Sequence, residues 1–343
     1  MEESKGIFRR IAGLAQSIAE PRGVWSMALY AQTAPFSTKT RLKVPHKLFD
    51  TKRIDLTGRS PHTYADPFVY VHDNILYVFF EEVQRGGHGE IAALSTSDLV
   101  NFKKTYPAFD HAYHVSFPYV FDIEKKPYMI PESSKNNSID LYEFDDFPTK
   151  LRKVRTLLVG DCADSHVFMH DNKWFLFTTI DGKLNLFFTD DLLAGVLTPH
   201  PMNPLTSDLR ISRSAGAALT LDGRLYRSAQ DCSNVYGENI SLIEIEELTT
   251  TSYRERVVVD KFFSLDKSWN ANGAHHLSIC EFYGKTVIAT DGKQTDYFIN
   301  RFSALYRSLF RLEARHHIPS SIGRIVASSA NPLHDRAKDG YHR

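Results

Sequence analysis

The stretch ADPFVYVHDNILYVFFEE, from Ala65 to Glu82, carries the pattern that decides the fold of this chain. An apolar run is followed by the two-residue turn Asp73-Asn74 and by a second apolar run that ends on two carboxylates. A turn-forming pair between two runs rich in β-branched and aromatic residues predicts a β-hairpin. The same pattern occurs four more times, beginning at Ser116, Ala163, Ser214 and Ala274.

The five copies recur at a regular distance. Aligned on their turns, successive copies are separated by 51, 47, 51 and 61 residues. The first four are each followed by a further β-rich run, starting at Glu90, Ile139, Leu184 and Ile240. Repeats of three or four short strands are typical of propeller blades, whereas a helical array would need apolar residues at i, i+3, i+4 and i+7. The sequence therefore predicts an all-β fold, a five-bladed β-propeller over residues 62–300.

Short additions flank the predicted propeller. In the segment 1–61, apolar residues at helical spacing predict a helix within 1–20. Residues 25–32 are expected to form an outer strand that closes the ring onto the last blade, and a polar connector follows. We expect a second helix from residue 300 onward, and this helix and a flexible tail make up the segment 301–343. Peripheral membrane contact through these terminal helices is an alternative to packing against the propeller.

The composition disfavours several classes of protein. The 343 residues include equal numbers of basic and acidic side chains, and the isoelectric point is near 7.3. A nucleic-acid-binding protein would carry a basic excess, so nucleic acid is not an expected partner. Three cysteines lack metal-ligand spacing, and residues 1–20 resemble neither a secretory signal nor a membrane span. These features predict a cytoplasmic protein, with the inner face of the membrane as an alternative location.

The blade pattern also predicts where a site would form. In an antiparallel hairpin, the start of the first strand and the end of the second strand lie at the same end. If each first strand lines a central channel, the residues at these two positions surround one mouth of the channel. The residues entering the first strands are Asp66, Phe117, Asp164, Ala215 and His275. Those leaving the second strands are Glu81-Glu82, Glu132, Thr179, Gln230-Asp231 and Asp291.

Carboxylates are concentrated at this predicted mouth. Taken one at a time, Asp and Glu at strand ends commonly cap turns. Taken together, acids at equivalent repeat positions predict a functional site. Like charges held close together raise the pKa of at least one carboxyl group, and such a separation of pKa values distinguishes a general acid from a general base.

Two of these acids resemble a known family. Asp66 in ADPF and Asp164 in ADSH, the first residues of blades one and three, are similar to the pattern of five-bladed furanosidase-like propellers such as arabinanases, xylosidases and invertases. The resemblance implies that Asp66 is a base, nucleophile or sugar-positioning group and that Asp164 orients the sugar and tunes the acid. The arabinanase-like families take their general acid from blade four, where this chain offers Arg213. Glu132 of blade two is the nearest replacement, and this departure disfavours ordinary glycoside hydrolysis.

A longer series of motifs resembles a second family. In chain order, YADPFVY, HVSFPYVF, YMIPESS, IDLYEF, HPMNP, RSAG, LYRSAQDCSNVYG and GAHH are similar to the propeller at the N-terminus of plant glucosamine inositolphosphorylceramide transferases. In the plant proteins a glycosyltransferase domain follows, and we expect no room for one after residue 320. The resemblance implies cell-surface polysaccharide or glycolipid assembly. The implied partners are a sugar or nucleotide-sugar and a glycan or glycolipid acceptor.

Further residues are predicted to bind the substrate. Arg213 and Arg227 are suited to grip a diphosphate or lipid phosphate, or else they pair with Asp231 or Glu132. Trp269 offers an aromatic face for a sugar ring. The other predicted binding residues are Glu82, His114, His166, Gln230, Asp231 and His275. No metal ligands are assigned, because two adjacent histidines are weak evidence. A Ca²⁺ ion on the axis near His275, as in furanosidase-like propellers, is left as an alternative.

Three functions follow from these observations. The leading hypothesis is a glycosyltransferase-like enzyme in which Asp66, Glu132 and Asp164 form the catalytic set. The second is a glycoside hydrolase or phosphorylase that uses Asp66 and Glu132. The third is a non-catalytic glycan-binding propeller that works with a separate transferase. Loss of nucleotide-sugar binding in Arg213→Ala would select the first hypothesis, and cleavage of simple aryl glycosides would select the second.

Overall fold

The computed structural model describes residues 22–50, 61–84, 87–265 and 269–296. They belong to one compact unit, Arg22–Asp296, and are almost entirely β-structure; the one helical element among them is the 3-10 turn η1 (Ser134–Asn136). The two predicted terminal helices and the tail lie outside the described residues. Within the described part of the chain, no helix is long and apolar enough to cross a membrane.

All five predicted hairpins are confirmed. They are β3–β4 (Pro61–His72, Ile75–Gln84), β7–β8 (Ser116–Ile123, Lys126–Glu132), β11–β12 (Cys162–His170, Lys173–Ile180), β16–β17 (Leu219–Leu221, Arg224–Gln230) and β20–β21 (Leu277–Phe282, Lys285–Asp296). Both residues of every turn have positive φ, from Asp73-Asn74 to Tyr283-Gly284. Positive φ at both central positions defines the type I′ turn, whose twist matches that of the paired strands.

Additional strands widen the hairpins into sheets. The first hairpin continues into β5 (Gly89–Thr96) and β6 (Lys103–Thr105), and the second into β9 (Ser138–Asp146) and β10 (Lys150–Val159). The third continues into β13 (Lys183–Thr189) and β14 (Thr198–Pro199). The fourth continues into β18 (Ile240–Leu248) and β19 (Tyr253–Val259) and also includes β15 (Arg213–Ser214). The β-rich runs predicted after the first four hairpins therefore form strands.

The predicted N-terminal strand is also confirmed, and it pairs with the last hairpin. β1 (Arg22–Gln32) runs antiparallel to β21 along its whole length. β2 (Lys47–Phe49), within the segment predicted as a polar connector, pairs with the other side of β1. A single parallel pair, Trp25 with Thr63, joins β1 to β3, so these two groups of strands form one eight-stranded sheet. The remaining sheets have four, four and five strands.

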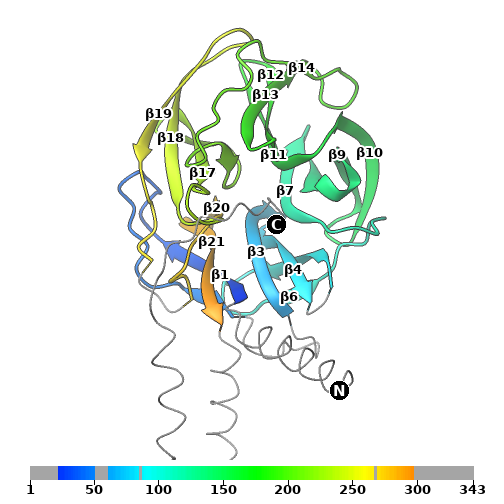
Figure 1. The fold of residues 1–343 in the computed structure, drawn as a ribbon. Helices are drawn as coiled ribbons and strands as arrows, with labels where there is room; N and C mark the ends of the chain where they lie inside the picture. Colours follow the sequence, from blue (N-terminus) through cyan, green and yellow to red (C-terminus); the bar gives the residue numbers. More distant parts are fainter. Residues whose placement is uncertain (1–21, 51–60, 85–86, 266–268, 297–343) are drawn as a thin grey trace, which may run out of the picture. The chain divides into compact units, whose positions relative to one another are not determined.

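The hydrophobic core lies between the faces of neighbouring sheets. One buried cluster joins Met27 and Leu29 of β1 to Val78 and Phe80 of β4, and another joins Ile130 of β8 to strands of the third sheet. The first strands β3, β7 and β11 lie side by side near the centre of the unit (Figure 1). Because alternate residues of a strand face opposite sides, the apolar residues fill the layers between sheets while the strand ends remain available for polar groups.

Candidate functional site

Three first strands are interrupted at the same place by a β-bulge. The register shifts between Ala65 and Phe68, between Ser116 and Tyr119, and between Ala163 and His166. Inside these bulges Asp66, Phe117 and Asp164 have φ values of 52°, 44° and 49°. A non-glycine residue in this region is strained by about 1–3 kcal/mol, and such strain is concentrated at functional sites. The bulges therefore make the predicted mouth the candidate site.

One group of residues at this mouth, the histidine cluster, consists of Asp66, His275, His276 and Asp291. Asp291 is fully buried and accepts three backbone N–H groups: Oδ1 from His275 (2.9 Å) and His276 (3.1 Å), Oδ2 from Asp66 (3.1 Å). Nδ1 of His275 lies 2.6 Å from Oδ2 of Asp291, out of line for a hydrogen bond, and 3.8 Å from Oδ1 of Asp66. The imidazole therefore lies against two carboxyl groups that come from opposite ends of the sequence.

Burial and neighbouring charges shift the pKa values of the residues in the histidine cluster. Burial raises the pKa of Asp66 well above its usual value, and the neighbouring acids Asp164, Glu81 and Asp291 add to this effect. Burial alone would lower the pKa of His275, but Asp291 and Asp66 outweigh it and raise the value to about 9. For Asp291, burial is outweighed by His275 and the pKa is lowered. At neutral pH this cluster therefore contains an imidazolium–carboxylate pair beside Asp66, whose protonated form is favoured by burial.

Aromatic rings hold His275 in place. The indole of Trp25 stacks on the imidazole with centroids 3.9 Å apart, and Tyr236 approaches the imidazole edge-on at 5.2 Å. Gly237 lies against the same rings, since a Cβ there would be 2.8 Å from Trp25 and 2.9 Å from His275. A charged imidazole stacked on the face of an indole is stabilised by the quadrupole of that ring. This packing makes His275 a rigid part of the site.

The second group, the arginine cluster, consists of Glu132, Asp164, Arg213 and Gln230. Oδ2 of Asp164 accepts Nε of Arg213 at 2.5 Å and Nε2 of Gln230 at 2.6 Å. Its backbone N–H donates to Oε2 of Glu132 at 3.0 Å, and Nη2 of Arg213 is 3.7 Å from the same oxygen. The Arg213 side chain remains 28% exposed, so the arginine cluster is not closed off from solvent.

The pKa values of the two carboxyl groups in the arginine cluster shift in opposite directions. Burial and the charge of Asp164 raise the pKa of Glu132 well above its usual value. Burial opposes ionisation of Asp164 as well, but Arg213 and the hydrogen bonds it receives lower its pKa. The surroundings therefore favour the protonated form of Glu132 and the ionised form of Asp164. Two interacting acids with separated pKa values are the arrangement that supports acid–base chemistry.

The two clusters adjoin. Oδ2 of Asp66 accepts the backbone N–H of Phe117 at 3.2 Å, which connects the first bulge to the second. The guanidinium of Arg213 lies over the ring of Tyr236 at 5.2 Å, and the same ring contacts His275. Residues predicted from five different hairpins are thus brought together, as the repeat geometry required.

The histidine cluster also contains donor atoms for a metal ion. One ligand atom each from Asp66, His275 and Asp291 lies within 4.8 Å of the others. Ca²⁺ takes six to eight oxygen ligands, whereas this group offers two carboxylates, one of which already accepts three backbone N–H groups. The imidazolium neutralises the ionised carboxylate. These residues do not fit Ca²⁺ well, and we derive no step through a metal.

Four predicted binding residues lie apart from the two clusters. Arg227 is fully buried in a bidentate ion pair with Glu255, at 2.6 and 2.7 Å, and does not adjoin Arg213. Glu82 is buried beside Lys104 and Tyr106, on the opposite face of β4 from Glu81. Asp231 caps a turn through Ser233, and Trp269 packs against Gly292 in the core. In each case burial or a local polar partner occupies the side chain.

Two further histidines, His114 and His166, were predicted to bind the substrate. Nε2 of His114 is 3.1 Å from Glu81, an acid that raises the pKa of Asp66, so His114 flanks the histidine cluster through one residue. His166 is fully buried between aromatic rings, and both ring nitrogens lack a hydrogen-bond partner. Burial and the charge of Arg227 lower the pKa of His166 to about 3, so it is a neutral core residue.

Three residues of the site, His276, Trp25 and Tyr236, were absent from the predicted set. Asp291 was predicted to lie at the mouth but was given no role; it directly follows the part of β21 that pairs with β20. Trp25 comes from β1, outside the five copies, and no sequence pattern connects it with His275. Tyr236 lies in the loop that follows β17, and the length of this loop left the direction of the Tyr236 side chain unpredicted.

The fold belongs to a known class. The chain is similar to the catalytic domain of a GH62 α-L-arabinofuranosidase from Coprinopsis cinerea, with a TM-score of 0.53, 14% identity and coverage of 78% of this chain and 97% of that one. A GH43 α-L-arabinofuranosidase from Clostridium thermocellum matches with a TM-score of 0.51, 18% identity and coverage of 66% and 81%. This all-β chain therefore shares the fold of the glycoside hydrolase propellers.

The family follows from the sequence. Residues 18–293 match the family described as Glucosamine inositolphosphorylceramide transferase 1, N-terminal, and the chain belongs to that family. It is 30% identical over 301 residues to glucosamine inositolphosphorylceramide transferase 1 of Arabidopsis thaliana, covering 79% of this chain. The protein of the same name from Oryza sativa subsp. japonica is 31% identical over 246 residues, 66% of this chain. The matches span 39% and 33% of those proteins.

Proposed function

We propose that the described sheets form a five-bladed propeller closed by the N-terminal strand. Divided at its single parallel pair, the eight-stranded sheet yields β20-β21-β1-β2 and β3-β4-β5-β6, which with the other three sheets makes five groups. Neighbouring first strands are in contact from β20 through β3, β7 and β11 to β15. The backbone N–H of Leu277 donates to the carbonyl of Ala215 at 2.7 Å, which supports contact between the fourth and fifth groups.

We further propose that the mouth of this propeller carries a glycosyltransferase-like activity in cell-surface polysaccharide or glycolipid assembly. The observation that carries the proposal is the contact of Glu132 and Asp164, whose pKa values shift in opposite directions, with the partly exposed side chain of Arg213. A carboxyl group whose pKa is raised toward neutrality can exchange a proton with a sugar hydroxyl at working pH. The family membership and the glycoside hydrolase fold support a carbohydrate as the substrate.

Each residue of the two clusters has a proposed role. Glu132 acts as the acid/base group toward an acceptor hydroxyl. Asp164 orients Arg213, whose exposed part stabilises the negative charge that develops on a phosphate leaving group. Asp66, whose protonated form is favoured by burial, donates a hydrogen bond that positions a sugar hydroxyl. His275 and Asp291 hold the Asp66 backbone and preorganise the mouth.

Hydrolysis of the furanosidase type is the second candidate, and the protonation pattern disfavours it. Such hydrolysis requires one protonated and one free carboxyl group across the scissile bond. Burial favours the protonated form of both Asp66 and Glu132, while Asp164, whose ionised form is favoured, is engaged by Arg213 and Gln230. A leaving group stabilised by Arg213 needs no free nucleophilic carboxylate, which favours transfer from a nucleotide-sugar. A location in the cytoplasm, at the inner face of the membrane, suits both a nucleotide-sugar donor and a glycolipid acceptor.

The test is a comparison of donors. The purified chain is incubated with a panel of nucleotide-sugars and glycolipid acceptors and, separately, with aryl furanosides and pyranosides, and the products are measured by mass spectrometry. We expect transfer that depends on Glu132 and Arg213, with Arg213→Lys weaker than the parent and Glu132→Gln nearly inactive. Release of sugar from aryl glycosides without transfer would establish the hydrolase instead. Glycan binding with neither product would leave a binding propeller.

A further inference from the structure

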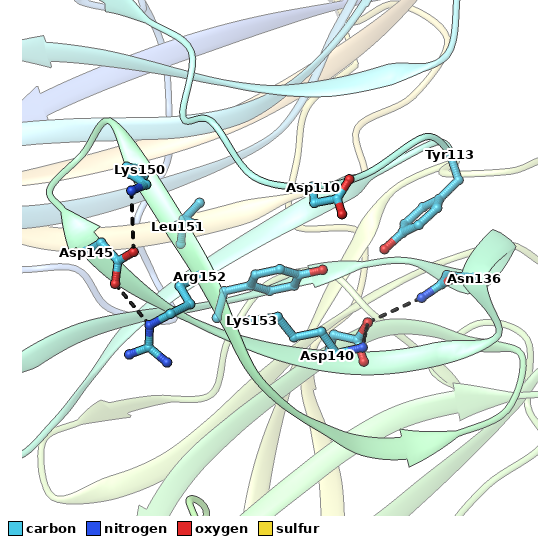
Figure 2. A pocket seen from close by; sticks show the side chains of 10 residues that line it. Asp110, Tyr113, Asn136, Asp140, Asp145, Lys150, Leu151, Arg152 and Lys153 are labelled. Carbon is cyan, nitrogen blue, oxygen red and sulfur yellow. Dashed lines mark hydrogen bonds and ion pairs between the residues drawn. The ribbon is translucent and has the colours of Figure 1, made fainter.

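A second concave site lies on the sheet β7–β10, away from both clusters. The pocket has a volume of about 490 Å³ and opens between the loop that precedes β7 and the outer strands β9 and β10. Asp110 and Tyr113 lie on the loop side, and Asn136, Asp140 and Lys153 lie on the strand side (Figure 2). It shares no residue with the histidine cluster or the arginine cluster. The volume falls within the range of small-molecule sites.

Two buried polar side chains line this pocket. Asp140 is fully buried, and its carboxylate oxygens contact Thr156 (2.7 Å), Lys153 (2.8 Å) and Asn136 (3.3 Å). Tyr142 is 3% exposed; its ring packs on Phe109 with centroids 5.2 Å apart, while Tyr113 and Asp110 lie close enough to perturb its hydroxyl. Burial and the neighbouring Tyr113 hydroxyl raise the pKa of Tyr142, so its phenol stays neutral and can donate a hydrogen bond.

The charges of the pocket balance. Lys153 pairs with Asp140, and Arg152 and Lys150 pair with Asp145 at 3.1 and 3.9 Å. An anionic ligand would therefore find no cation free of a carboxylate partner among the lining residues. Asp110 has no cationic partner among the described residues, so the lining keeps one free acceptor group together with the phenols of Tyr113 and Tyr142. This inventory suits an uncharged ligand rich in hydroxyl groups.

We propose that this pocket binds a short segment of a neutral oligosaccharide. Tyr113 presents a half-buried aromatic ring at the rim, and sugar rings stack on such faces while their hydroxyls bond the polar groups beneath. The turn η1 connects the pocket to the mouth: Ser134 donates to Glu132 at 3.4 Å, and Asn136 donates to Asp140. A glycan held in the pocket thus lies on the sheet that supplies Glu132. That this glycan is the acceptor of the transfer reaction rests on the proposed function. That the pocket binds a neutral oligosaccharide does not depend on that function.

Binding is measured without turnover. Neutral pentose and hexose oligosaccharides, a uronic-acid oligosaccharide and inorganic phosphate are titrated into the full chain and followed by ligand-observed NMR and calorimetry. We expect binding of a neutral oligosaccharide that is at least about tenfold weaker in Asp110→Ala/Tyr113→Ala. The matched control Asp190→Ala/Tyr283→Ala removes an exposed aspartate and an exposed tyrosine elsewhere and is expected to bind like the parent. Asp110→Asn, which keeps the size of the side chain, is expected to weaken binding several-fold and serves if the double variant fails to fold.

The outcomes separate this inference from the proposed function. Absence of neutral oligosaccharide binding, tighter binding of the uronic acid or phosphate, or unchanged binding in both Asp110 variants would overturn the inference, even where transfer is observed. Conversely, Glu132→Gln is expected to abolish transfer and leave oligosaccharide binding unchanged. Binding that depends on Asp110 and Tyr113 in a chain without any transfer would support the pocket and contradict the proposed activity.

Discussion

In each of the two clusters at the mouth a buried aspartate is neutralised by a cation, but the cation differs. In the arginine cluster, Asp164 is neutralised by a guanidinium that remains charged at every accessible pH. In the histidine cluster, Asp291 is neutralised by an imidazole whose pKa is raised to about 9. The first cluster is partly exposed through Arg213, whereas the second is closed by Trp25 and several buried groups. The comparison teaches that the accessible cluster is suited to chemistry and the closed cluster to holding the mouth in shape.

The largest expected effect is on activity, in the arginine cluster. Glu132→Gln keeps the size of the side chain but removes its exchangeable proton, so turnover should fall by about 10²–10⁴-fold, the range of a lost acid/base group. The rate of sugar transfer measures this effect. Stability should not fall with it, since the raised pKa of Glu132 means that its ionised form is disfavoured in the folded protein. A variant with full turnover would remove Glu132 from the chemistry.

The next effect is on stability, in the histidine cluster. Asp291→Ala leaves three backbone N–H groups and the imidazolium without their acceptor, so we expect a loss of about 3–5 kcal/mol in the free energy of unfolding. Denaturant titration measures this loss, and Asp291→Asn, which keeps one acceptor oxygen, should lose less. A change below about 1 kcal/mol in Asp291→Ala would mean that this cluster does not hold the mouth.

A pH dependence should distinguish the two clusters. The pKa of His275 is about 9 in the folded protein and near 6.5 when unfolded, so its stabilising contribution is complete below pH 6.5 and is lost as pH rises toward 9. A shift of this size corresponds to about 3 kcal/mol. Thermal unfolding between pH 6 and 10 measures this loss, and His275→Gln should flatten the curve. NMR titration of the ring with an apparent pKa near 6.5 would contradict the assignment.

The smallest effect concerns the packing between the clusters. Gly237 has a φ of +67°, and a Cβ there would meet Trp25 and His275 at less than 3 Å. Gly237→Ala should therefore cost about 1–3 kcal/mol through backbone strain and displaced rings. Gly223→Ala is the matched control, because its φ of +74° imposes similar strain while nothing lies within 4 Å. Equal melting temperatures for the two variants would show that the rings do not depend on this contact.

Much of this architecture could be predicted because its signals are local. Each hairpin is encoded by a two-residue turn, such as Asp73-Asn74, between β-rich runs, and the turn geometry and strand pairing are decided within about twenty residues. The convergence of Asp66, Glu132 and Asp164 followed from applying one geometric rule to every copy. The direction of individual side chains did not follow. Arg227 lies in the same sheet as Arg213, and Glu82 directly follows Glu81, yet both point into buried ion pairs away from the two clusters.

By itself, then, the sequence determined the hairpins, their number and the acids that meet at one end, because repeated local patterns repeat the same backbone geometry. The tertiary structure alone decided which of those acids keep a proton, since protonation depends on burial and on partners that come from distant strands. It also brought Trp25 to His275 by pairing β1 with β21, a contact between the two ends of the sheet region. No local pattern records such a pairing, because its free energy comes from surfaces that exist only after the chain has closed on itself.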